Sequence, residues 1–204
     1  VGLSVANVLT GEMLKSMNKD PIVFAMANPV PEILPPLAKS VRSDVIIATG
    51  RSDFSNQVNN VLGFPSIFRG ALDTRATQIN EDMKLAAVHA LAELAREDVP
   101  DSVSAAYSNQ IFHFGREYII PKPFDNRVLL KVAPAAARAA MKSGVAQRPI
   151  EDWAEYTHQL ESLQSQTRGF IRTIMNRVKA KAAADHSHLP VIYFPEGRST
   201  KILK

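Results

Sequence analysis

Amide side chains follow two short apolar runs in this chain, and amides are groups that can bind a polar ligand. The run 21–27 ends in Asn28, and the run 44–49 leads to Asn59 and Asn60. A neutral amide can donate a hydrogen bond to one ligand oxygen and accept one from another group without adding charge. This chemistry suits a carboxamide or a hydroxy acid.

Both apolar runs are typical of buried parallel strands, because they are short, nearly continuous and flanked by turn residues. A Pro-rich turn and a short helix expected near 34–40 separate them. Strand, helix, strand crossovers of this kind build parallel sheets. Ligands bind beyond the carboxyl ends of such strands, so the amides lie where a ligand is expected.

The second strand is followed by a cluster of amides that has two interpretations. Asn56, Gln57, Asn59 and Asn60 could contact a ligand, but amides in loops also satisfy turns and helix caps. Asn28 precedes a proline, which predicts an extended backbone at that position. Because amides follow both strands, the interpretation as ligand contacts gains support over a purely structural role. Residue types alone predict a nucleotide-binding half-domain and go no further.

Periodicity and capping residues predict three further helices, at 10–17 with Thr10 as N-cap, 80–94, and 126–142 ending at Gly144. The segment 119–124 is expected to be a loop, because its prolines cannot donate to a strand ladder.

Apolar residues at alternating spacings of three and four predict one long amphipathic helix over 149–184. Its seam consists of Trp153, Tyr156, Leu160, Leu163, Thr167, Phe170, Ile174 and Val178. We expect this helix to pack on its own domain or to connect two domains; an independent coiled coil or a membrane-surface helix is the alternative. His186 and His188 beyond it lack the supporting ligands of a metal site.

Composition excludes several classes of protein. There is no cysteine, and no apolar run approaches the ~20 residues that span a bilayer. The net charge of +4 comes from 24 basic and 20 acidic residues, and the late basic excess lacks the aromatic platform of an RNA-binding surface. We expect a cytoplasmic protein without a membrane or nucleic-acid partner.

Four motifs, in order, resemble the cofactor-binding domain of malic enzymes, most closely the large bacterial NADP-dependent type. They are Val1-Gly-Leu-Ser4 with Val8-Leu-Thr10, the run 22–32 with its Asn-Pro pair, the run 46–53, and the run 56–70 with its Asn-Asn pair. The resemblance implies an α/β fold in which 1–145 form the C-terminal half of a Rossmann-like NAD(P)-binding domain with parallel strands. A long helical linker is then expected over 146–188. The last segment, 189–204, is similar to the opening of a phosphate acetyltransferase-like domain, so we expect the chain to be a fragment of a longer protein.

Malic enzymes oxidise malate with NADP or NAD and decarboxylate the product to pyruvate and CO2, with Mg²⁺ or Mn²⁺ as a Lewis acid. Carried over by motif, the resemblance implies that Asn28 contacts both the nicotinamide end of the cofactor and the substrate. Asn59 and Asn60 would contact the substrate, and Gly2 and Ser4 would border the cofactor.

The resemblance also implies which groups are elsewhere. The family's general acid tyrosine, catalytic lysine, metal-binding carboxylates and Gly-rich phosphate loop lie upstream of Val1, so we assign no catalytic or metal-binding residue here. Tyr107, Tyr118 and Lys122 are not given those roles. The expected partners are malate and pyruvate and further copies of the chain, with acetyl-CoA regulation through the C-terminal domain.

Two other function classes stay open. One is a different α/β NAD(P)-dependent dehydrogenase built on the same sheet. The other is a non-catalytic regulatory or assembly module in which the helix at 149–184 drives association. The choice between NADP and NAD is also open, because contacts to the ribose 2′ position normally follow the first βα unit of the fold.

Overall fold

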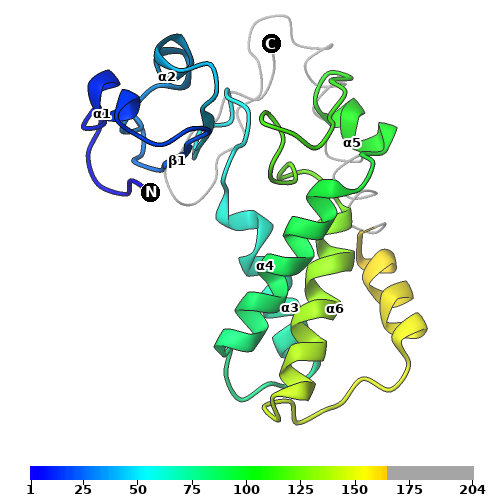
Figure 1. The fold of residues 1–204 in the computed structure, drawn as a ribbon. Coiled ribbons are helices and arrows are strands. Elements are labelled where there is room, and N and C mark those ends of the chain that lie inside the picture. Colours follow the sequence, from blue (N-terminus) through cyan, green and yellow to red (C-terminus); the bar gives the residue numbers. More distant parts are fainter. Residues whose placement is uncertain (165–204) are drawn as a thin grey trace, which may run out of the picture. The chain divides into compact units, whose positions relative to one another are not determined.

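A computed structural model describes residues 1–164, and their first part is an α/β arrangement (Figure 1). Strands β1 (Ile22–Ala25) and β2 (Ile46–Thr49) pair in parallel. Helix α2 (Pro35–Val41) connects them, with prolines in its first turn where a missing N–H is tolerated. The predicted strand, helix, strand order is confirmed.

Single residues extend the sheet on both sides. Gly2 pairs in parallel with Ala25, and Gln57 pairs in parallel with Thr49. The N–H of Gly2 donates to the carbonyl of Phe24 over 2.8 Å. Four segments therefore run in the same direction, and the residues that follow them leave at one edge of the sheet.

One apolar cluster lies between the strands and the first two helices. Its buried members are Leu14, Val23, Ala25, Ile33, Ala38, Val45 and Ile47. Helix α1 (Gly11–Lys15) has the predicted N-cap, because the Thr10 hydroxyl accepts from the N–H of Met13 over 3.2 Å. The helix ends at Lys15, slightly before the expected end at residue 17.

Three helices pack together after the sheet in the described part of the chain. They are α3 (Phe64–Asp73), α4 (Glu81–Arg96) and α6 (Arg127–Lys142), and α6 packs against both of the others (Figure 1). The predictions for α4 and α6 are confirmed to within two residues at each end. Asn80 caps α4 by accepting from the N–H of Met83 over 3.1 Å, and its amide also donates to Ser143 beyond α6 over 2.8 Å.

Helix α3 approaches α6 very closely at Gly70. A Cβ at this glycine would lie 2.5 Å from the carbonyl oxygen of Ala133 and 3.0 Å from the Cβ of Ala136. The facing side of α6 carries small buried side chains, namely Ala133, Ala136, Ala137 and Ala140. The contact between the two helices therefore depends on small residues on both of them.

Residues 107–126 link the short helix α5 (Asp101–Ala106) to α6 without a helix or strand, which confirms the loop predicted at 119–124. Phe112 stacks on Tyr118 with ring centroids 5.4 Å apart. The ammonium of Lys122 lies 5.0 Å from the ring centroid of Phe112, a cation–π contact, and the side chain is only 9% exposed. Burial lowers the pKa of Lys122 and raises the pKa of Tyr118 to about 12.

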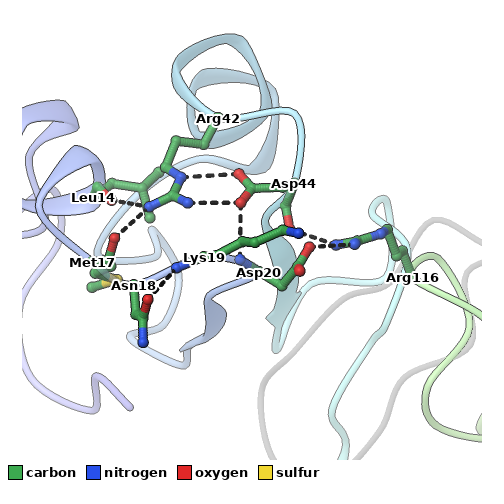
Figure 2. A network of polar contacts seen from close by, with 8 residues as sticks. All are labelled: Leu14, Met17, Asn18, Lys19, Asp20, Arg42, Asp44 and Arg116. Carbon is green, nitrogen blue, oxygen red and sulfur yellow. Dashed lines mark hydrogen bonds and ion pairs between the residues drawn. The ribbon is translucent and has the colours of Figure 1, made fainter.

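A polar network ties the entry of β2 to its surroundings (Figure 2). The Arg42 guanidinium donates twice to the Asp44 carboxylate, over 2.9 and 2.6 Å, and once to the carbonyl of Met17 over 2.6 Å. Arg116 donates to the carbonyl of Asp44 and to the carboxylate of Asp20. The hydrogen bonds from Arg42 hold the pKa of Asp44 well below its ordinary value. The network thus anchors the loop at 116 to the strand's entry.

The long helix expected over 149–184 begins later than predicted. Residues 153–164 are helical, whereas 149–152 are not. Near the start of this helix, the Tyr156 hydroxyl donates to the Asp73 carboxylate over 2.8 Å. Asp152 accounts for the later start, because its carboxylate caps the helix by accepting from the N–H groups of Ala154 and Glu155 over 2.9 Å each.

The predictions for the rest of the chain lie outside the described residues. These are the remainder of the long helix to 184, most of the expected linker at 146–188, and the segment at 189–204. Within residues 1–164, no helix combines the length and the apolar character needed to cross a bilayer.

Candidate functional site

Asn28 lies just beyond the carboxyl end of β1, with an exposed side chain. Its peptide bond to Pro29 is cis. Its amide makes no hydrogen bond to another group within the described part of the chain. Both the donor and the acceptor of this amide are therefore available to a ligand.

Glu32 joins two of the predicted segments next to Asn28. One carboxylate oxygen accepts from the N–H of Ser4 over 3.1 Å, and the other accepts from the N–H of Ala27 over 3.0 Å. Glu32 is 2% exposed, and a Cβ at Gly2 would lie 2.4 Å from its carboxyl carbon. A side chain at position 2 would displace the Glu32 carboxylate from its place beside the backbone.

The carboxylate of Glu32 is held in its charged form by backbone groups. Burial would raise its pKa, but the N–H groups of Ala27, Glu32 itself and Ser4 outweigh burial and lower the pKa below its ordinary value. With each oxygen occupied by an amide, Glu32 positions the backbone at this edge. Glu32 was not predicted from the sequence. Its one distinguishing feature there is that it is an isolated acidic residue in a Pro-rich apolar stretch.

We expect Glu32→Gln to lower the free energy of unfolding of the intact protein by about 2 kcal/mol at neutral pH, because the glutamine NH₂ would face a buried N–H donor. The folded pKa of Glu32 is lowered, so its contribution is complete above the ordinary carboxyl range and is lost as the pH falls through the folded pKa. Urea unfolding at a series of pH values should show the gap between wild type and variant shrinking in acid.

Glu12→Gln is the matched control for this substitution. Glu12 is exposed and pairs only with Lys15, over 2.9 Å, among the described residues. This substitution should change stability little at any pH. A gap between wild type and Glu32→Gln that is independent of pH would contradict the assigned charge of Glu32.

The amides after β2 separate into different roles. Asn59 is the N-cap of the 3-10 helix η1 (Asn60–Leu62), and its side-chain oxygen accepts from the N–H of Val61 over 3.0 Å. Asn60 is exposed, and its amide has no hydrogen-bond partner within residues 1–164. Asn60 is thus free to bind a ligand on both sides of its amide, whereas the oxygen of Asn59 is already used.

Asn56 is buried and fully engaged. Its amide nitrogen donates to the carbonyl of Ile47 over 3.1 Å and to that of Arg116 over 2.7 Å, and its oxygen accepts from the N–H of Ile119 over 2.9 Å. Gln57 pairs with Thr49 through its backbone. The ligand interpretation therefore does not apply to Asn56, which connects three parts of the backbone.

All the predicted site residues lie at or beyond the same edge of the sheet. Gly2 and Ser4 belong to the first parallel segment, Asn28 follows β1, and Asn59 and Asn60 follow the segment at Gln57. This is the carboxyl edge, where open α/β sheets bind ligands. Asn28 and Asn60 have free amides there, while Gly2 and Ser4 make backbone contacts to the sheet and to Glu32.

Comparison with known proteins gives a family for this arrangement. Residues 1–107 match the family described as malic enzyme, NAD-binding domain. The NADP-dependent malic enzyme of Escherichia coli is 52% identical over 203 residues, a match covering 100% of this chain and 26% of that protein. The NADP-dependent malic enzyme of Halomonas elongata is 62% identical over 149 residues, which cover 73% of this chain and 35% of that protein.

Solved structures agree with the sequence comparison. The crystal structure of the Entamoeba histolytica malic enzyme matches with a TM-score of 0.71 at 36% identity, over 85% of this chain and 32% of that one. The chain spans only 26% to 35% of the length of these relatives. The matched region contains the parallel sheet of a Rossmann-like domain together with its carboxyl edge. The chain therefore belongs to the malic enzyme family, and its residues 1–107 match the NAD-binding domain of that family.

Proposed function

We propose that the protein containing this chain oxidises malate and decarboxylates the product to pyruvate and CO2 while reducing NADP or NAD. The observation that carries this proposal is the free amide of Asn28 at the carboxyl end of β1, in a domain whose relatives are named NADP-dependent malic enzymes. This chain would supply part of the pocket for nicotinamide and malate. A cytoplasmic location is part of the same proposal.

The residues of this chain would bind and orient the reactants. Asn28 can donate to one oxygen and accept from the nicotinamide carboxamide, and Asn60 can donate to an oxygen of malate. Glu32 bonds the N–H groups of Ser4 and of Ala27, the residue before Asn28, and its carboxylate lies against Gly2. Gly2 and Ser4 would therefore border the cofactor near Asn28. When bound, the cofactor accepts a hydride and a divalent metal acts as a Lewis acid, with the metal ligands supplied by residues outside this chain.

The assay that tests this function uses the intact protein with malate, with NADP and NAD in separate reactions, and with Mg²⁺ or Mn²⁺. With at least one of the two cofactors, we expect reduced cofactor and pyruvate to form in equal amounts, and neither to form without malate. Cofactor reduction with another hydroxy acid but not with malate would indicate a different α/β dehydrogenase. A folded protein with no turnover on any hydroxy acid would indicate a regulatory or assembly module.

A further inference from the structure

The loop that carries Asn59 and Asn60 is held by a segment far downstream in the sequence, residues 116–119, which we call the strap. Asn56 bonds the strap twice, donating to the carbonyl of Arg116 over 2.7 Å and accepting from the N–H of Ile119 over 2.9 Å. The neighbouring Ser55 hydroxyl donates to the Glu117 carboxylate over 2.6 Å. Two consecutive loop residues thus contact the strap.

Asn56 has a backbone conformation that glycine would adopt with less strain. Its φ is 54°, in the left-handed region, which asparagine tolerates better than most side chains. The side chain is 2% exposed and also donates to the carbonyl of Ile47 in β2. The distinctive contribution of asparagine here is therefore its three hydrogen bonds, which join the loop, the strand and the strap.

The strap is itself anchored to the sheet and to α2. Arg116 donates to the carbonyl of Asp44 and to the carboxylate of Asp20 at the entry of β2, as Figure 2 shows. Glu117 pairs with Lys39 of α2 over 2.6 Å. The strap therefore connects Asn56 to the entry of β2 and to α2, and so holds it in place relative to the sheet.

A short, tightly bonded path leads from Asn56 to the free amide of Asn60. The N–H of Val58 donates to the carbonyl of Thr49 over 2.8 Å, which binds the loop to the end of β2. Asn59 then caps the turn that begins at Asn60. The stretch between Asn56 and Asn60 is thus bonded to β2, and Asn56 also bonds it to the strap.

We propose that Asn56 is a positioning residue that, together with the strap, sets the place of Asn60 and so the orientation of bound malate. This inference rests on the proposed function. Misplacing a substrate-positioning group by about 1 Å can cost ~10²-fold in rate. Because Asn56 is buried and fixes the loop through three hydrogen bonds, we expect its loss to impair the reaction with malate.

The test uses Asn56→Gly in the intact protein, since glycine keeps the left-handed backbone while it removes the buried side chain and its three hydrogen bonds. We expect the KM for malate to rise about tenfold, while the dissociation constant of NADP changes less than about twofold and thermal unfolding stays cooperative. The control is Asn109→Gly: Asn109 has φ 60°, is exposed, and makes no side-chain hydrogen bond within 1–164. This variant should keep the wild-type KM.

A second variant, Glu117→Gln, keeps the inference testable if Asn56→Gly fails to fold. The Glu117 side chain is 60% exposed, and the change removes the charge that pairs with Lys39 while leaving an acceptor for Ser55. We expect a rise of about two- to threefold in the KM for malate alone. An unchanged malate KM in whichever variants fold overturns the inference, and so does a parallel loss of NADP binding. Wild-type protein that does not turn over malate would instead refute the proposed function.

Discussion

Replacing Asn28 with alanine in the intact protein is expected to lower kcat/KM for malate by about a hundredfold or more, with little effect on folding. Under the proposed function the amide contacts both malate and the nicotinamide, and a hydrogen bond to a charged group contributes about 1.5–3 kcal/mol. Each 1.4 kcal/mol corresponds to a factor of ten. Because the side chain is exposed and has no hydrogen-bond partner within residues 1–164, its removal should cost little stability.

Steady-state kinetics with varied malate and NADP, together with thermal unfolding of the same preparation, check this prediction. Asn28→Asp should also be nearly inactive, because its negative charge would repel the carboxylates of malate. Asn18→Ala is the control: Asn18 is an exposed asparagine that precedes β1, so it lies away from the carboxyl edge. A wild-type kcat/KM in Asn28→Ala would remove Asn28 from the site.

Gly70→Ala should destabilise the protein by about 2 kcal/mol, although alanine is the better helix former by roughly 1 kcal/mol. The new Cβ would meet the carbonyl oxygen of Ala133 at 2.5 Å and the backbone nitrogen of Ala137 at 3.0 Å. These are backbone atoms of α6, so they cannot move aside unless the helix itself shifts. Overpacking of this kind typically costs 1–3 kcal/mol or more, which exceeds the gain in helix propensity.

Chemical denaturation of the intact protein measures this difference. Gly63→Ala is the matched control, because within residues 1–164 a Cβ there would contact only the Cδ1 of Ile67, at an ordinary distance of 3.7 Å. The control should shift the unfolding midpoint little. If Gly70→Ala were as stable as the wild type, α3 and α6 would be able to move apart at this contact without a loss of stability.

Local pattern was enough to predict the strands and the two longest helices of the described chain. β1 and β2 are short apolar runs between turn residues, and α4 combines helical periodicity with a recognisable N-cap at Asn80. Helix α3 was not predicted. Pro65 and Gly70 suggest a turn when seen alone, and Gly70 makes sense only beside α6, which is far away in the sequence.

In the candidate site, too, some features follow from local sequence and others depend on contacts between distant residues. Residue type and position after a strand selected Asn28 but could not separate the amides that follow β2; the resemblance to malic enzymes selected Asn59 and Asn60 among them. In the structure, Asn56 is bonded to backbone groups, and the oxygen of Asn59 caps η1. What separates them is the partner each amide meets. Asn56 bonds Arg116 sixty residues away, and Glu32 bonds Ser4 across 28 residues. Pairings at such separations come from the tertiary fold.

The three hydrogen bonds of Asn56 all end on backbone atoms, those of Ile47, Arg116 and Ile119. Evolution can therefore replace the side chains of these partners without breaking the bonds. Selection on this brace would act instead on Asn56 and on the number of residues in the strap, because an insertion or deletion there would move the backbone groups out of reach. Among homologues, the brace would be recognised by constant loop length more readily than by constant sequence.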